Sequence, residues 1–190
     1  MGFKVDPETS SAIKTSDYDG CGYSRGHMAP SFAMSSRFGA AGARSTFVMS
    51  NVCPQFQSHN SGQWGSLEAL IAGRKGTGEF VKGWADTLGE VWVVVGPVFG
   101  EAFPPLKKGD VAVPSAFYCI VVDEVKGKPR MLAFLMKHED EKRGNLVPFL
   151  TSVDKIEALT GLNFFSELPD SIEDSLEQQQ ATELWATSSK

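Results

Sequence analysis

Cysteine is scarce in this chain of 190 residues, which contains only Cys21, Cys53 and Cys119. Three cysteines without a Cys-x-x-Cys pair exclude a disulfide scaffold and argue against a structural zinc site. Cys119 stands in an apolar run, which predicts a buried core thiol. A bridge between Cys21 and Cys53 stays open, because sequence spacing alone cannot decide it.

Long apolar runs are also missing. No stretch reaches the length of about 20 residues that is needed to cross a bilayer. The first residues, Met1 to Asp6, lack the apolar core of a secretory signal peptide. We therefore expect no membrane partner. A start at Met1-Gly2 also admits an upstream segment that this sequence does not contain.

A strong charge of either sign is absent from most of the chain, although the net charge is −5. Residues 1–150 hold 16 basic and 15 acidic side chains, whereas residues 151–190 hold 2 and 8. The acidity is therefore concentrated in the tail, and the body can still present a basic groove to a polyanion. We expect a domain over residues 1–169, followed by an acidic, Gln-rich tail over residues 170–190 that is helical or disordered.

Hydrophobic periodicity predicts alternating helices and strands after an irregular lead-in over residues 1–22. Helices are expected at 31–44 (ending in a loop), 60–71, 79–88, and from a capping-box-like start at 151–154 to 160. Strands are expected at 45–50, 91–95, 117–122 and 131–136. The run 91–95 is the most apolar, so we expect it to be the central strand, covered on both faces and ended by Gly96-Pro97.

The stretch Arg25-Gly26-His27 places a cation and an imidazole two residues apart. A guanidinium can clamp a phosphate group with its planar fork. An imidazole titrates near neutral pH and can therefore accept a proton from water. This combination indicates hydrolysis of a phosphodiester. Taken alone, the pattern also fits a structural histidine that caps a turn.

A second stretch carries Asn51, Asn60 and Glu68. Asn60 stands at the expected start of a helix, where it could act as an N-cap with Gln63 reaching back. Magnesium keeps several of its waters, so the amide oxygen of Asn60 would suffice as its direct protein ligand. Glu68 lies two turns further on and could hold metal-bound water. An ordinary exposed helix glutamate is the alternative for this position.

In chain order, these stretches resemble the DNA/RNA non-specific endonucleases, a family of secreted bacterial sugar-nonspecific nucleases and mitochondrial endonuclease G. The family signature is Asp-Arg-Gly-His, then Ser/Thr-Asn-x-x-Pro-Gln, then Leu-Asn-x-x-x-Trp-x-x-Leu-Glu. This chain carries similar blocks at 24–27, 50–55 and 59–68, and later ones at 93–99, 113–118 and 156–165. The likeness runs in order over residues 17–169.

The resemblance implies an α+β fold, namely a mixed α/β single domain with a central antiparallel sheet and a ββα-metal active-site motif. It also implies that His27 is the general base and that Asn60 is the sole direct protein ligand of a hydrated Mg²⁺, with Mn²⁺ as an alternative. Arg25, Asn51 and Glu68 match the supporting residues of the family. The implied reaction is endonucleolytic hydrolysis of DNA and RNA with little sequence preference.

The resemblance also bears on partners and location. DNA and RNA are the implied substrates, and the family admits a homodimer and an inhibitor protein. Relatives of this kind are commonly exported or sequestered. The resemblance therefore favours a secreted or periplasmic location, although this chain carries no signal peptide.

Two positions depart from the family pattern. Ser24 replaces the leading aspartate, and Ala72 stands where the family has an arginine on the phosphate side. Arg74 or Lys82 could fill that substrate-binding role. Because of Ser24, the alternative is a catalytically weakened relative that binds nucleic acid without cutting it. A third interpretation is a phosphodiesterase that acts on a smaller substrate.

Overall fold

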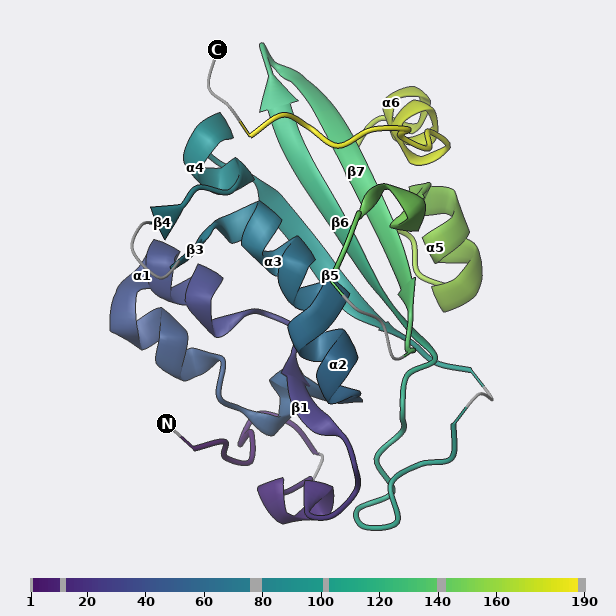
Figure 1. Cartoon of the computed structure of the whole chain (residues 1–190). Helices are drawn as coiled ribbons and strands as arrows, with labels where there is room; N and C mark the ends of the chain where they lie inside the picture. Colours follow the sequence, from purple (N-terminus) through teal and green to yellow (C-terminus); the bar gives the residue numbers. More distant parts are fainter. Residues whose placement is uncertain (1, 11–12, 76–79, 101–102, 140–142, 188–190) are drawn as a thin grey trace.

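The largest sheet has four antiparallel strands in the order β5-β6-β7-β8 (Figure 1). The structure is a computed structural model that describes residues 2–10, 13–75, 80–100, 103–139 and 143–187. The four strands are β5 Trp92–Val98, β6 Ala116–Val125, β7 Lys128–Lys137 and β8 Leu150–Thr151. Strands β6 and β7 contain the strands predicted at 117–122 and 131–136. They form a hairpin whose turn residues Lys126 and Gly127 both have positive φ, 54° and 76°. Such turns match the twist of the paired strands.

Strand β6 is the central strand and is covered on both faces. Phe117, Cys119 and Val121 belong to one core cluster, which also contains Trp64 and Leu67 from the helical side. The alternate residues Tyr118 and Ile120 belong to a second cluster that packs against Val153 and Ile156. A strand buried on both faces is apolar throughout, because successive side chains point to opposite sides. Cys119 is 2% exposed, so the prediction of a core thiol is confirmed.

The prediction for residues 91–95 is wrong. Strand β5 lies at the edge of the sheet, and Trp92 and Val93 are 52% and 41% exposed. The strand also continues through Gly96-Pro97 to Val98. Proline is tolerated in an edge strand because no neighbour requires its missing N–H group. The apolar run is therefore explained by the cavity that β5 lines, and not by a central position.

Three further predictions of local structure need correction. Helix α1 spans Ser31–Ser45 and passes through a kink at Gly39 (φ 64°), where a loop was expected. The predicted strand 45–50 is the end of α1 followed by an irregular segment and the 3₁₀ turn η2 at Met49–Asn51. The predicted helix 79–88 is only α4, Trp84–Leu88, because the chain before it forms a hairpin of β3 Arg74–Lys75 and β4 Phe80–Val81. In each case packing overrides short-range propensity.

The ββα unit lies beside this sheet. Strand β1, Ser24–His27, pairs antiparallel with β2, Val52–Gln55, and His27 is opposite Val52. One helical run follows, divided into α2 Gln57–His59, a π-helical turn η3 Asn60–Trp64, and α3 Gly65–Ala72. The ββα part of the predicted fold is therefore present. Trp64, Leu67 and Ile71 are buried, as the helical spacing predicts.

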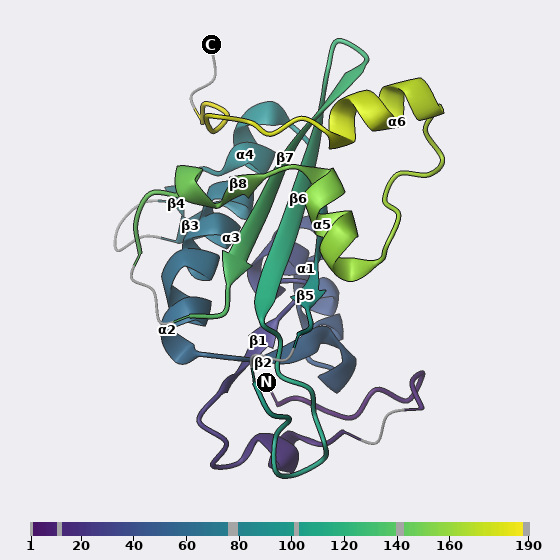
Figure 2. The ribbon, with the colours of Figure 1, turned by 90° about the vertical axis from the view of Figure 1, so that its right-hand side faces the viewer.

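The C-terminal region covers the other face of the sheet. Figure 2 shows α5 and α6 in front of the strands, with α1 and α3 behind them. Helix α5, Val153–Thr160, follows the short turn η4, Val147–Phe149. It is capped by Ser152, whose hydroxyl accepts from Lys155 N, and ends at Gly161 in the left-handed conformation (φ 70°). Helix α6 spans Asp170–Glu177. Beyond it, Leu184 and Trp185 pack against the core, and Trp84 Nε1 donates to Trp185 O at 3.0 Å.

The lead-in forms the 3₁₀ turn η1, Thr15–Tyr18, and a single bridge between Lys4 and Val48. All three cysteines are free thiols, so the structure contains no bridge between Cys21 and Cys53. Among the helices that the structure describes, none is both long and apolar enough to cross a membrane.

Candidate active site

Gly26 is the position of the ββα unit where a side chain is least tolerated. A Cβ atom on Gly26 would overlap Gln55 Oε1 and lie 2.8 Å from Gln55 Cδ. Gln55 cannot easily move, because it is fully buried and its amide nitrogen donates to His59 Nδ1 at 2.8 Å. The glycine in Arg-Gly-His is therefore a packing requirement of the strand pair.

We expect Gly26→Ala to destabilise the fold. Overpacking a tight site typically costs about 1–3 kcal/mol, and the blocking Gln55 side chain is held in place. Urea unfolding monitored by tryptophan fluorescence measures the loss. Gly2→Ala is the matched control, because nothing lies within 4 Å of its added Cβ. Equal unfolding free energies for the two variants would contradict this account of Gly26.

Ser24 and Asn60 are joined directly. The amide nitrogen of Asn60 donates to Ser24 Oγ at 3.2 Å, and Ser24 Oγ donates to Gln55 O at 2.8 Å. Because the amide nitrogen is used in this way, the Asn60 amide oxygen is the group left to accept or to ligate. Asn60 directly follows α2 inside the helical run, so it is not the N-cap residue. The N-cap expectation for Asn60 is therefore wrong, since the run begins earlier, at Gln57.

His27 lies at the end of β1 between two aromatic rings. Its ring centroid is 5.0 Å from that of Phe3 and 5.0 Å from that of Phe47. Its Nε2 atom is buried and has no hydrogen-bond partner among the described residues. Burial lowers the pKa of His27 below its ordinary value of 6.5. The imidazole is therefore neutral at pH 7, which is the state that can accept a proton.

Arg25 is held by the N-terminal lead-in. Its guanidinium donates to Thr15 O at 2.5 Å, pairs with Asp19 at 3.3 Å, and lies over the Tyr18 ring at 5.3 Å. Arg25 and His27 share one face of β1, whereas Ser24 and Gly26 face the helix. The structure therefore joins Ser24 to Asn60, and it places Arg25 and His27 beside the lead-in.

The side chain of Asn51 hydrogen-bonds to backbone groups of other segments. Its amide oxygen accepts from Ala29 N at 2.9 Å, and its amide nitrogen donates to Ala29 O at 3.1 Å and to Thr46 O at 3.0 Å. Its own carbonyl accepts from Met28 N at 2.9 Å. Asn51 stands at the entry of β2, and not after a strand at 45–50 as the sequence predicted. Its hydrogen bonds hold the segment after His27 against the residue that ends α1.

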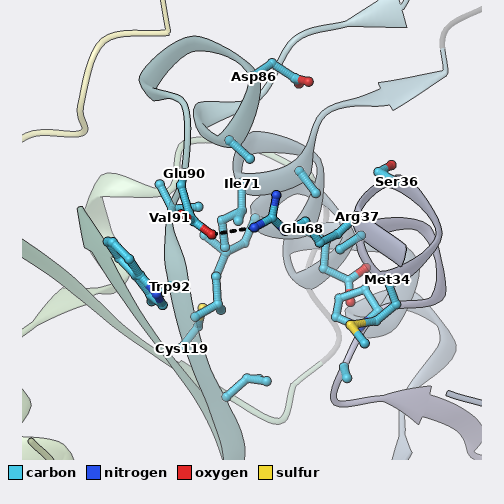
Figure 3. A pocket seen from close by; sticks show the side chains of 18 of the residues that line it. Met34, Ser36, Arg37, Glu68, Ile71, Asp86, Glu90, Val91, Trp92 and Cys119 are labelled. Carbon is cyan, nitrogen blue, oxygen red and sulfur yellow. Dashed lines mark hydrogen bonds and ion pairs between the residues drawn. The ribbon is translucent and has the colours of Figure 1, made fainter. Parts of the chain in front are cut away.

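Glu68 lines a largely apolar cavity of about 530 Å³ between α1, α3, α4 and β5 (Figure 3). Burial raises the pKa of Glu68 to about 7, and the nearby indole N–H of Trp64 offsets part of the rise without forming a hydrogen bond of ordinary geometry. Arg37 from α1 lines the same cavity and pairs with Glu90 at 2.8 Å. Sequence reasoning missed Arg37, because only the packing of α1 against α3 places it there.

Arg74 and Lys82 lie apart from these contacts. Arg74 is exposed in β3, and Lys82 is exposed directly after β4. Arg74 is paired in the hairpin with Val81, the residue before Lys82. Whether either contacts substrate stays a prediction. Ala72, at the position of the family arginine, lines the cavity of Glu68.

Two buried histidines, His59 and His138, lie beside the ββα unit. His138 Nε2 accepts from Phe56 N at 2.7 Å, and His138 Nδ1 donates to Pro114 O at 2.8 Å. This pattern requires neutral His138 with its proton on Nδ1. His59 is fully buried, and burial together with the nearby His138 lowers its pKa to about 4. His59 is thus a packing residue, whereas His138 gave no sequence signal because its partners are remote in the chain.

Acid should destabilise the fold through His59. A folded-state pKa of about 4, against 6.5 in the unfolded chain, means that the unfolded chain binds the proton first as the pH falls. The stabilisation is complete above pH 6.5 and is lost towards pH 4, by roughly 3 kcal/mol. Urea unfolding at several pH values should show a steeper acid loss for the wild type than for His59→Gln. Parallel curves would count against this role.

The fold and the site define the class of this protein. The family described as DNA/RNA non-specific endonuclease matches residues 1–171. The chain belongs to this family.

Individual relatives agree with this membership. The chain is 31% identical over 176 residues to a nuclease of Nostoc sp., covering 88% of this chain and 59% of the relative. It is 33% identical over 184 residues to the mitochondrial nuclease EXOG of Homo sapiens, covering 87% of this chain and 46% of the relative. A solved structure of the EndoG/EndoGI complex matches this chain with a TM-score of 0.69 and 27% identity. The match covers 83% of this chain and 65% of that chain. The chain thus spans about half to two thirds of the length of these proteins.

Proposed function

We propose that this protein is a metal-dependent endonuclease that hydrolyses phosphodiester bonds of DNA and RNA with little sequence preference. The observation that carries the proposal is the ββα unit, in which consecutive parts of one motif supply a neutral His27 and an Asn60 amide oxygen that has no hydrogen-bond partner among the described residues. Membership in the non-specific endonuclease family supports the same reaction class.

In this proposal, His27 accepts the proton of the attacking water. Its Nε2 is buried without a partner among the described residues, so no competing donor occupies it. The rings of Phe3 and Phe47 hold the imidazole and exclude bulk water from two sides. A neutral imidazole with a pKa below 6.5 stays competent in weakly acidic solution.

The amide oxygen of Asn60 fits a hydrated Mg²⁺ as a ligand, with Mn²⁺ as an alternative ion. Ser24 fixes the amide nitrogen of Asn60, and the remaining amide oxygen is a hard, neutral ligand of the kind that these ions accept. A bound divalent ion would neutralise charge on the scissile phosphate and on its leaving oxygen. Glu68, with its raised pKa, and Asn51, which fixes residues 28–30, are proposed as positioning residues.

Arg25 is proposed to contact the substrate phosphate. Its present partner Asp19 is 65% exposed in its side chain, and exposed ion pairs contribute only about 0–1 kcal/mol. A phosphate can therefore compete with Asp19 for the guanidinium. Arg74 and Lys82 are the proposed sources of further phosphate contacts, because both are exposed cations, one in β3 and the other directly after β4.

Degradation of plasmid DNA and of RNA with Mg²⁺, with and without chelator, tests this function. We expect both polymers to be cut only when the metal is present. The alternative function is a catalytically weakened nucleic-acid-binding relative with Ser24 in place of the family aspartate. Ser24 keeps a hydrogen bond to Asn60, which favours the active form. Retardation of DNA in a gel without cleavage, and cleavage restored by Ser24→Asp, would favour the alternative.

The relatives bear on the proposed partners and on the location. DNA and RNA are the proposed substrates, and a homodimer is a further proposal. An inhibitor protein is proposed because the matching solved structure is a complex with an inhibitor. The names of the relatives include mitochondrial nucleases of Homo sapiens and Saccharomyces cerevisiae and a nuclease of Serratia marcescens, so they assign no single location. We retain the division of the chain after residue 169 as a proposal.

A further inference from the structure

A second cluster of metal-binding side chains lies away from the ββα unit. Asp154 and Glu157 of α5 and Glu177 at the end of α6 each offer a carboxylate oxygen, and these three oxygens lie within 4.8 Å of one another. Figure 2 shows α5 and α6 in front of the sheet, on the side away from α1 and α3. The cluster therefore belongs to neither His27 nor Asn60.

Glu177 is the unusual member of this cluster. It is 4% exposed, and its Oε1 atom is buried without a hydrogen-bond partner among the described residues. Burial and the neighbouring carboxylates, Glu157 first among them, raise its pKa to about 7. A buried carboxylate without a partner is costly, because it loses hydration and gains nothing in return. This residue requires a compensating group.

No basic side chain supplies that compensation within the described parts of the chain. None of the ion pairs found there involves Asp154, Glu157 or Glu177. The nearest lysine in sequence, Lys155, instead donates to Gln180 Oε1 at 3.0 Å. Three carboxylates that approach one another without a cation repel, and the repulsion acts across the contact of α5 with α6.

We propose that Asp154, Glu157 and Glu177 bind a calcium ion that joins α6 to α5. Calcium takes six to eight oxygen ligands, carboxylates among them, in flexible geometry, whereas magnesium keeps several of its waters and is usually bound through one or two carboxylates. Three carboxylate oxygens within 4.8 Å of one another therefore suit calcium better. One oxygen of Glu157 accepts from Phe164 N at 2.7 Å, which orients the carboxylate and leaves its other oxygen for the ion.

The proposed site has a structural consequence for the C-terminal segment. Helix α6 carries Glu177, and the residues that follow it return to the core through Gln180, which donates to Leu150 O at 3.0 Å, and through Trp185. An ion at Glu177 would fix the start of this return path. Calcium is therefore expected to stabilise the attachment of the segment after α6 to the sheet, and the site is independent of the nuclease reaction.

Calorimetric titration of CaCl₂ into the full, chelator-treated chain tests the proposal. Glu177→Gln removes the buried charge at nearly constant shape and should weaken calcium binding at least about tenfold. Asp174→Asn is the matched control, because it removes an exposed acid from the same helix and should change the affinity less than about threefold. Repeating the titration in Asn60→Ala separates this site from any metal at the candidate active site. Binding lost with Asn60→Ala but unchanged in Glu177→Gln would overturn the proposal.

A second measurement covers a failure of Glu177→Gln to fold. Asp154 is exposed, so Asp154→Asn should preserve the fold and still weaken calcium binding. Calcium should raise the melting temperature of the wild type and of Asp174→Asn, but not that of Asp154→Asn. If Glu177 is instead simply protonated, calcium will leave every melting temperature unchanged, and the proposal is then wrong.

Discussion

Replacement of His27 by alanine should lower the nuclease turnover of this protein by about 10²- to 10⁴-fold, the usual contribution of a general base. The loss is expected because the neutral imidazole is the only proposed acceptor for the proton of the attacking water. The Michaelis constant should change little, since His27 is not proposed to bind the polymer. Cleavage of plasmid DNA at saturating Mg²⁺ measures the effect.

Two controls separate catalysis from folding. The thermal unfolding midpoint of His27→Ala should stay close to that of the wild type, because the residue is only partly buried. Added imidazole should restore part of the activity of His27→Ala, since a small base can enter the space left by the ring. The acid limb of the pH–rate profile should lie below pH 6.5 in the wild type, because burial lowers the pKa of His27. A folded variant with near-wild-type turnover would remove His27 from the mechanism.

Replacement of Asn60 by alanine is expected to lower activity by about 10²- to 10³-fold, because the ion stabilises charge by several kcal/mol and each 1.36 kcal/mol is a factor of ten. The loss should be larger at limiting Mg²⁺ than at high Mg²⁺, since the variant removes the proposed direct ligand. Rates measured over a wide Mg²⁺ range would distinguish a weakened metal site from a misplaced base.

Ser61→Ala is the matched control for this variant. Ser61 is the exposed neighbour of Asn60, and its hydroxyl donates to Gln57 O in the same helical run. Its removal should leave the Mg²⁺ dependence unchanged. Ser24→Ala provides an intermediate case, because it removes the acceptor of the Asn60 amide nitrogen but keeps the amide oxygen. Identical Mg²⁺ titrations for wild type and Asn60→Ala would disprove the ligand role.

Much of the candidate site follows from short motifs. The motif places Arg25 and His27 two residues apart, whereas the packing reason for Gly26 lies in Gln55 on the paired strand and became visible only in the structure. The strands at 117–122 and 131–136 and the end of a helix at residue 160 were also predicted, because strand and cap preferences depend on neighbouring residues. Family membership rests on the same ordered motifs.

Other features were not predictable from the sequence. Three contacts join residues that are distant in the chain or follow irregular backbone. They are the hydrogen bond from Asn60 to Ser24, the hydrogen bonds of Asn51 to Ala29 and Thr46, and the approach of Glu177 to α5. The buried pair His59 and His138 depends on the packing of β7 beside the ββα unit. The hydropathy pattern does not predict such contacts, because it shows which residues are buried and not which side chains form hydrogen bonds.

The sequence by itself determined the family, the order of the motifs and the candidate residues proposed for the chemistry. Only the tertiary structure decided which strand is central, which face of β1 carries His27, and where the acidic side chains gather. The physical reason is that periodicity reports how much of a segment is buried and not what covers it. The run at 91–95 is apolar because it lines a cavity at the edge of the sheet, whereas β6 is apolar because two layers cover it.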